Sequence, residues 1–314
     1  MWHSKKVIVT GSTGVIGREL VKKLLKRGAI IRCFDITPQP KEFLRKVEYC
    51  QRDLSVLNPI EFVNFNPEII FHLAATFERT EEVPEFWEDN FTNNIVLSHK
   101  IIDTARKCTH LKKFIFASSY LIYSPELYLF NKPQINPRKL EEADLPNPRN
   151  LCGAAKYYTE KELEFMNRMY DGFISISARI YRVYGFSSRD VISRWIKMAL
   201  KGDELIVFQK ENMFDYIFAG DVAEGLIKMA ENVNKNKIIN LGTGTARKIE
   251  EVIKILREQI PNIKIKEIKK EEFFETSCAD ISKLTELTEW QPKTILEEGI
   301  RKVLDYEKRT FKGE

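Results

Sequence analysis

Histidine and cysteine are scarce in this chain of 314 residues, which has four histidines and five cysteines. There is no Cys-x-x-C pair, and no His/Cys/Asp group has the spacing of metal ligands, so we expect no bound metal. An odd number of scattered cysteines also disfavours a disulfide framework. A reducing cytoplasm is therefore the expected location.

Long apolar runs are absent as well, since no stretch approaches the roughly 18–20 residues that a membrane helix needs. We expect no signal peptide either, because a predicted strand begins within the first seven residues. The 50 basic and 45 acidic residues leave a net charge of +5. That charge suits an anionic small molecule, but a solvated lysine-rich surface explains it at least as well. No basic patch with interleaved aromatics is visible, so we expect neither a membrane nor a nucleic-acid partner.

A glycine-rich turn near the N-terminus carries the first functional signal. The β-branched run 7–9 leads into Thr10-Gly11-Ser12-Thr13-Gly14-Val15-Ile16-Gly17, and residues 18–25 follow with helical periodicity. This is the context of a dinucleotide fingerprint, in which glycines let the backbone approach a pyrophosphate at a helix N-terminus. An ordinary strand-to-helix turn is the alternative. The next strand, 30–34, favours the fingerprint because it ends in Asp35, where a carboxylate would meet a ribose 2′-hydroxyl. No arginine adjoins Asp35, which favours NAD over NADP.

Apolar strands alternate with amphipathic helices up to about residue 180, which predicts repeated βαβ units. The expected fold is α/β: a Rossmann-type, doubly wound parallel sheet with a smaller C-terminal α/β lobe for the substrate. The candidate strands are 6–10, 30–34, 69–73, 113–117 and 173–178, with a later one at 238–241. We expect residues 1–181 to form the cofactor domain, with a returning segment near 213–243, and residues 182–314 to form most of the substrate lobe.

The predicted lobe is less regular than the N-terminal part. It is expected to hold helices near 188–201, 248–260 and 295–310 and a short strand at 205–208. Residues 124–149 include five prolines and have no clear periodicity. Loops of this length are often functional, so we interpret this segment as a wall of the substrate site.

Several further segments resemble the extended short-chain dehydrogenase/reductases, the branch of NAD-dependent epimerases and dehydratases that modify nucleotide sugars. The glycine spacing Gly-x-x-Gly-x-x-Gly resembles this branch, and six later segments follow in the family's order. They are Arg52-Asp53-Leu54, Phe71-His72-Leu73-Ala74-Ala75, Asp89-Asn90, Ser118-Ser119-Tyr120-Leu121-Ile122-Tyr123, Arg179-Ile180-Tyr181-Arg182-Val183-Tyr184-Gly185 and Asp215-Tyr216-Ile217-Phe218-Ala219-Gly220-Asp221-Val222. In the family, Asn90 would open a helix.

The resemblance implies a set of site residues. Expected cofactor contacts are Gly11, Thr13, Gly14, Val15, Ile16, Gly17, Asp35, Asp53, Leu54, Leu73, Ala74, Ala75, Asn90, Lys156 and Tyr181. Expected substrate contacts are Thr76, Ser119, Tyr120, Arg182, Arg189 and Arg194, with Lys269 and Lys270 as further candidates. The expected catalytic residues are Ser119, Cys152 and Lys156. The family also implies a homodimer through helices near 92–107 and 153–169.

Cys152 is the main departure from the family, because it stands where the Tyr-x-x-x-Lys signature has its tyrosine. In the family the lysine holds the nicotinamide ribose, the tyrosine takes the proton of a sugar hydroxyl, and Ser or Thr binds the same oxygen. A thiol remains titratable, with a reference pKa of about 8.5 against about 10 for a phenol, but it is shorter. If the protein is an enzyme, its general base is another residue, water or the substrate itself. If it is not, Cys152 is a small structural residue in an NAD-binding protein that no longer catalyses a reaction. An engineered change or a shifted register, Tyr157-x-x-x-Lys161, is the remaining alternative.

Other departures narrow the reaction. Ser119-Tyr120-Leu121 stands where 4,6-dehydratases have Thr-Asp-Glu, so dehydration is not expected. Phe214 replaces an arginine that clasps the diphosphate in epimerases, while Arg182 replaces an asparagine facing the same group. Arg182 is therefore either a relocated diphosphate ligand or part of a salt bridge. The sequence predicts NAD-dependent oxidation or reduction of a sugar hydroxyl on a nucleotide sugar, by a dehydrogenase or an epimerase.

Overall fold

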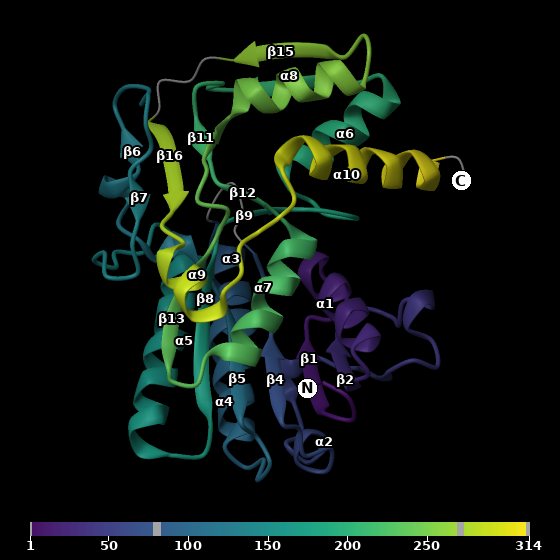
Figure 1. The fold of residues 1–314 in the computed structure, drawn as a ribbon, viewed down its shortest axis with the longest axis vertical. Helices are drawn as coiled ribbons and strands as arrows, with labels where there is room; N and C mark the ends of the chain where they lie inside the picture. Colours follow the sequence, from purple (N-terminus) through teal and green to yellow (C-terminus); the bar gives the residue numbers. More distant parts are fainter. Residues whose placement is uncertain (1, 78–82, 269–272, 312–314) are drawn as a thin grey trace.

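The computed structural model describes residues 2–77, 83–268 and 273–311, and its centre is a seven-stranded parallel sheet (Figure 1). The strand order is β13 (Lys237–Leu241), β8 (Ile174–Ile180), β5 (Lys113–Ser119), β4 (Ile69–His72), β1 (Lys6–Thr10), β2 (Ile30–Asp35) and β3 (Glu48–Gln51). The chain winds outward from β1 in one direction and from β4 in the other. The switch point therefore lies between the carboxyl ends of β1 and β4, where open α/β sheets bind their ligands.

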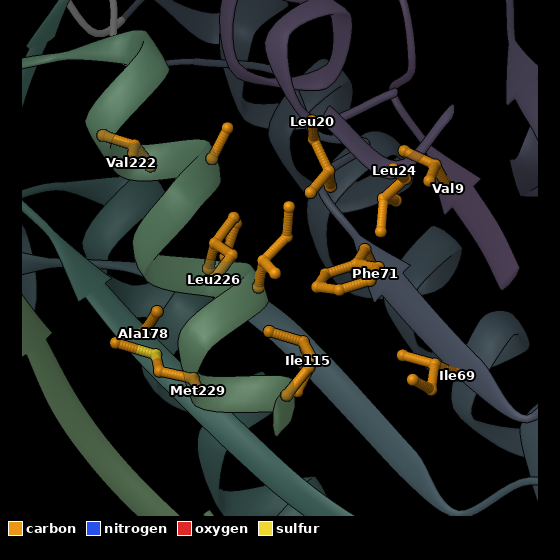
Figure 2. Close-up of a cluster of buried hydrophobic side chains, with 14 of the residues drawn as sticks. Val9, Leu20, Leu24, Ile69, Phe71, Ile115, Ala178, Val222, Leu226 and Met229 are labelled. Atoms are coloured by element: carbon orange, nitrogen blue, oxygen red, sulfur yellow. The ribbon is translucent and has the colours of Figure 1, made fainter. Parts of the chain in front are cut away.

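Helices cover both faces of this sheet. The helices α1 (Val15–Lys26), α7 (Ala219–Asn232) and α9 (Ser282–Thr288) pack on one face, and α2 (Ile60–Val63), α4 (Leu97–Ala105) and α5 (Leu151–Met169) pack on the other. Alternate residues of a strand point to opposite faces, so Val7 and Val9 join the first core and Ile8 joins the second. Figure 2 shows Leu226 of α7, Leu20 of α1 and Phe71 of the sheet as parts of one buried cluster.

A second, smaller assembly of strands and helices lies beyond the carboxyl ends of the sheet (Figure 1). Its mixed sheet consists of β14 (Arg247–Lys248), β11 (Met213–Phe214), β16 (Phe274–Ala279), β6 (Leu129–Phe130) and β7 (Lys139–Leu140). Its helices are α6 (Val191–Lys201), α8 (Ile249–Gln259) and α10 (Leu296–Phe311), which share one apolar core. Two parallel pairs complete it: β10 (Glu204–Phe208) with β15 (Lys264–Ile268), and β9 (Arg182–Tyr184) with β12 (Tyr216–Phe218).

The predicted fold class and all six predicted strands of the main sheet are confirmed. The boundary at residue 181 stays a prediction. Within the expected returning segment 213–243, α7 and β13 join the main sheet, whereas β11 pairs with strands of the smaller sheet. Residues 124–149 form more than a loop, because β6 and β7 both pair with β16. This segment is thereby attached to the smaller sheet.

One prediction about a helix end is wrong, and a second helix is confirmed with a later start. Asn90 does not open a helix: it is the last residue of α3 (Pro84–Asn90), which continues into a π-helix (Phe91–Val96) and then α4. The helix expected at 188–201 begins only at Val191, because Asp190 accepts a hydrogen bond from the backbone N–H of Ser193 and caps it. Arg189 therefore precedes the helix that carries Arg194.

Two observations bear on surfaces and metals. Within the described ranges, no helix has the length and apolar character that crossing a bilayer requires. Among the same residues, no three His, Cys, Asp or Glu side chains are grouped so that they could hold a metal ion.

Candidate active site

The glycine turn after β1 lies tightly against the end of β4. Gly11 has a φ of +67°, and a Cβ at this position would lie 2.7 Å from the backbone nitrogen of Ala74. Only glycine meets both conditions without strain. The turn leads to Gly14, which precedes α1 and provides no side-chain cap for it. The first N–H groups of α1 thus face the switch point with the geometry of an anion site.

Asp35 connects the end of β2 to this turn. Its Oδ2 accepts a hydrogen bond from the backbone N–H of Thr13 at 2.9 Å, and its Oδ1 accepts two from Thr37. The carboxylate is 9% exposed. Arg18 of α1 lies near the same turn, donating to the Thr13 carbonyl and pairing with Glu42. Arg18 was not predicted as a residue near the cofactor, because it precedes Asp35 in the chain and does not adjoin it.

The other expected cofactor positions surround the switch point. The hydroxyl of Thr10 accepts hydrogen bonds from the backbone N–H groups of Leu73 and Ala74, which fixes the chain beyond β4. Asp53 caps a short turn by accepting from the N–H of Ser55, and Leu54 is buried in the core behind it. The Thr10 contacts join the ends of β1 and β4 into one rim, and Asp53 follows the edge strand β3.

His72 lies beneath this rim and is fully buried. One ring nitrogen is 2.9 Å from the hydroxyl of Thr10, and the other is 3.0 Å from that of Ser98. Burial, together with the nearby positive charge of Lys156, lowers the pKa of His72 to about 3. The imidazole is therefore neutral at physiological pH, and it joins β1 to α4 through two hydrogen bonds.

This buried histidine predicts a loss of stability in mild acid. The unfolded chain takes up a proton near pH 6.5, whereas the folded chain does not until about pH 3, so stability falls as the pH drops below 6.5. Between pH 7 and 5.5 we expect the free energy of unfolding to fall by about 1 kcal/mol through this group. Urea unfolding at both pH values measures it, and His72→Gln should reduce the difference. An unchanged difference in that variant would contradict the assignment.

The helix α5 is positioned by two contacts at its start. The side-chain oxygen of Asn150 accepts from the N–H of Gly153 at 2.9 Å, which caps the helix. A Cβ on Gly153 would lie 2.5 Å from the carbonyl oxygen of Leu121, so glycine is needed for this close approach. The start of α5 is thus packed against the turn after β5, which begins at Ser119.

Cys152 and Lys156 lie on this helix, one turn apart. The Cys152 sulfur is 3.9 Å from Nδ2 of Asn94 and 4.0 Å from the carbonyl oxygen of Thr76, and the residue is 5% exposed. The ammonium of Lys156 lies 4.8 Å from the ring centre of Phe116. Burial lowers the pKa of Lys156 to about 8, opposed by the negative charge of a Cys152 thiolate. The structure thus brings together the two α5 residues that the sequence singled out.

The alternative register places its residues elsewhere. Lys161 is paired with Glu164 on the outer side of α5, and its ammonium lies 5.5 Å from the ring centre of Tyr157. Tyr158 is 49% exposed. The Lys161–Glu164 pair faces solvent, so the geometry favours Cys152 and Lys156.

A buried ion pair supports α5 one turn beyond Lys156. Glu160 accepts two hydrogen bonds from Arg179 of β8, at 3.1 and 2.8 Å, and a third from Ser118 at 2.6 Å. Both charged side chains are almost fully buried. The pair therefore ties the helix to β8 and to the end of β5, beside Ser119.

Arg182 lies where β9 meets the smaller sheet, and it forms a salt bridge. Its guanidinium is 3.3 Å from Glu275 of β16, and Arg149 and the hydroxyl of Tyr120 bind the same carboxylate. Two guanidinium groups share one carboxylate, so the cluster has a net positive charge. The ring of Phe214 packs on Arg182 at 4.7 Å.

The remaining expected substrate residues are more scattered. Tyr120 and Tyr181 are buried and stacked, with ring centres 5.0 Å apart. Arg189 is exposed and lies over Phe77, 5.9 Å from the ring centre, while Arg194 is exposed on α6. Lys269 and Lys270 lie outside the described residues.

Comparison with known proteins now assigns the chain. A family model described as "NAD dependent epimerase/dehydratase family" matches residues 7–242. The chain belongs to this family. A protein of Methanocaldococcus jannaschii named "Putative UDP-glucose 4-epimerase" is 29% identical over 314 residues, covering 96% of this chain and 98% of that protein. A UDP-N-acetyl-alpha-D-glucosaminuronate decarboxylase of Bacillus cytotoxicus is 25% identical, covering 96% and 97%.

A solved structure agrees over the whole chain. UDP-glucose 4-epimerase from Thermotoga maritima with UDP-glucose superposes with a TM-score of 0.84 at 28% identity, covering 98% of this chain and 99% of that one. Relatives in this epimerase/dehydratase family are thus named for different reactions of UDP-sugars. Family membership alone does not select one of these reactions.

Several residues of this family member entered the site only through the structure. They are Asn94 of the π-helix, Arg149 before α5 and Glu275 of β16. Asn94 lies in the segment Asp89-Asn90-Phe91-Thr92-Asn93-Asn94, where the resemblance points only to Asn90. Arg149 and Glu275 are 126 residues apart and meet only because β16 returns beside residues 124–149.

Proposed function

We propose that this protein is an NAD-dependent enzyme that oxidises or reduces a hydroxyl of a UDP-linked sugar, as a dehydrogenase or an epimerase. The main support is the position of Lys156, held beside Cys152 at the start of α5, on the helix packed against the turn that begins at Ser119. A half-buried ammonium over the ring of Phe116 is costly in a structural role alone, whereas hydride transfer needs a charge near the reacting oxygen.

The rim around the switch point suits a dinucleotide. The tight turn at Gly11 would let the pyrophosphate approach the N–H groups of α1, and Asp35 would accept from the adenosine ribose. NAD bound there would accept the hydride that leaves the sugar carbon. Lys156 would hold the nicotinamide ribose, and Ser119 would donate to the reacting oxygen. The other expected contacts at the rim, Asn90 and Tyr181 among them, belong to the same proposal.

The cluster around Glu275 suits the anionic half of the substrate. Its net positive charge and the half-buried guanidinium of Arg182 would favour a diphosphate, with Arg189 and Arg194 further out. Thr76 and Tyr120 would line the sugar site. In this division residues 1–181 and the segment near 213–243 hold the cofactor, and the rest of 182–314 holds the nucleotide sugar.

A second candidate function rests on Cys152 itself. A thiol at the position of the family's phenol is shorter, and an NAD-binding protein without turnover would tolerate it. Such a protein would retain NAD yet leave its redox state unchanged when sugars are added. Exchange of Cys152 for Tyr separates the two functions, because it should disrupt an enzyme adapted to cysteine and revive one that has lost activity.

The test uses UDP-, GDP-, dTDP- and CDP-linked sugars added to NAD-loaded protein, followed by absorbance at 340 nm and product analysis. A rise with UDP-sugars, or an epimerised product without a rise, supports the proposed enzyme. No rise and no new product, with NAD demonstrably bound, supports the binding protein. NADP serves as the control for the cofactor, since Asp35 should repel a 2′-phosphate.

We also propose a homodimer through α3, the π-helix, α4 and α5. Among the described residues, large apolar side chains of these helices are exposed: Trp87, Phe91, Tyr158, Phe165 and Met169, by between 48% and 68%. Large apolar side chains exposed on neighbouring helices favour an interface. We expect Phe165→Glu to shift the protein from dimer to monomer in size-exclusion chromatography with light scattering. Ile295→Glu, at an exposed apolar site on another surface, should not; a monomeric wild type would refute the proposal.

A further inference from the structure

The surroundings of the Cys152 sulfur come from three elements. Lys156 lies one turn along α5, the Thr76 carbonyl comes from the segment after β4, and Asn94 comes from the π-helix. A π-helix widens the helical turn and occurs mostly at functional sites. Here it lies between α3 and α4 and directs an amide toward the sulfur.

Asn94 is 2% exposed, and of its side-chain amide only the nitrogen forms hydrogen bonds. Its Nδ2 donates to Oδ1 of Asn90 at 2.7 Å and lies within hydrogen-bonding range of the Cys152 sulfur. Its Oδ1 is buried and has no hydrogen-bond partner. Leaving such an acceptor unsatisfied is costly. The unused oxygen, next to the thiol, therefore indicates a site for a small hydrogen-bond donor.

The charges around this site favour a thiolate. Lys156 lies one turn along α5, and its positive charge interacts with the Cys152 thiolate. His72, beneath it, is neutral above about pH 3. Asp89, near the end of α3, accepts hydrogen bonds from the hydroxyl of Thr76 and from the side-chain amide of Asn93. Both oxygens of the Asp89 carboxylate are therefore engaged by these two groups.

We propose that the Cys152 thiolate replaces the family's phenolate as proton acceptor, acting through one water molecule held by Oδ1 of Asn94. The proposal rests on the proposed function. A thiol ends about one ring depth short of a phenol, and one water spans such a gap. Asn94 is a positioning residue: its N–H stabilises the thiolate, and its oxygen orients the water.

The proposed step is balanced. The substrate O–H gives its proton to the water, which passes one of its own protons to the sulfur, so thiolate becomes thiol. The carbon loses a hydride to the nicotinamide, and its C–O bond becomes C=O. The reverse transfers reduce the ketone and restore the thiolate.

The first experiment needs no turnover. Thiolate absorbance at 240 nm is measured against pH in the full-length protein, and the absorbance of the Cys152→Ser protein at each pH is subtracted from it. We expect the midpoint of this difference to rise by about one pH unit in Asn94→Ala and by more in the size-matched Asn94→Asp. Asn93→Ala is the matched control, since Asn93 is on the same π-helix but binds Asp89. Equal midpoints in all four proteins would overturn the proposal.

The second experiment follows oxidation of the active UDP-sugar against pH. The acidic limb of the kcat profile should shift with the thiolate midpoint in both Asn94 variants, and Cys152→Ser should lose that limb. A limb that stays in place overturns the proton-acceptor role while the proposed function stands. If no sugar is oxidised or epimerised by the wild type, the proposed function and the proton-acceptor role both fail. A shifted midpoint would then show only that Asn94 stabilises the thiolate.

Discussion

Lys156→Met is expected to lower kcat for sugar oxidation by about 10²–10³-fold, the loss typical of removing one charged or hydrogen-bonding group from a transition state. Methionine retains an apolar stem of similar length but lacks the ammonium that lies over Phe116, so the loss would report the ammonium. We expect the affinity for NAD to fall as well, because the ribose loses a donor. Stopped-flow absorbance at 340 nm gives kcat, and fluorescence titration gives the dissociation constant of NAD.

Lys161→Met is the matched control for this prediction. Lys161 is on the same helix but pairs with Glu164 at the surface, so its removal should leave kcat within about twofold. If both variants lost activity equally, the effect would come from the helix and not from the site. If Lys156→Met retained full activity, Lys156 would have no role in hydride transfer.

The arrangement along α5 could be predicted from sequence because it is local. Residues four apart on a helix share a face, so Cys152 and Lys156 were expected on one side, and their interaction places them there. The strands of the main sheet were predicted for the same reason, as short apolar runs with turn residues on either side. β3 was missed because Glu48–Gln51 is a partly exposed edge strand without such a run.

Contacts between distant segments could not be predicted in this way. Strands of two residues, such as β6 and β7, have no periodicity, and their pairing with β16 depends on the tertiary fold. The convergence of Arg149 and Arg182 on Glu275 follows from that pairing. Asn94 was missed for a similar reason, because the widened turn of the π-helix is not visible in the pattern of apolar residues.

The second large effect is expected on stability, from the buried pair Glu160 and Arg179. Both side chains are at most 2% exposed, and the guanidinium binds both carboxylate oxygens. Removing one partner leaves the other charge buried and uncompensated, which costs about 3–5 kcal/mol. We therefore expect Glu160→Leu and Arg179→Met each to lower the free energy of unfolding by this amount, as measured by urea denaturation.

The double variant distinguishes the ion pair from simple packing. With both charges removed, no uncompensated charge remains, so we expect the double variant to recover most of the stability lost by either single one. Glu164→Gln provides a surface comparison on the same helix, where an exposed pair contributes at most about 1 kcal/mol. Additive losses in the double variant would show that the two side chains act independently.

The same pair should also affect the site, because Glu160 lies one turn beyond Lys156 and also binds Ser118, next to Ser119. In the double variant α5 would remain folded but would lose its tie to β8 and to the end of β5. We expect kcat to fall by about tenfold or more although stability is largely restored, since small displacements of catalytic groups are costly. A double variant with wild-type kcat would show that the two contacts at the start of α5, the Asn150 cap and the close approach of Gly153 to Leu121, suffice to position the helix.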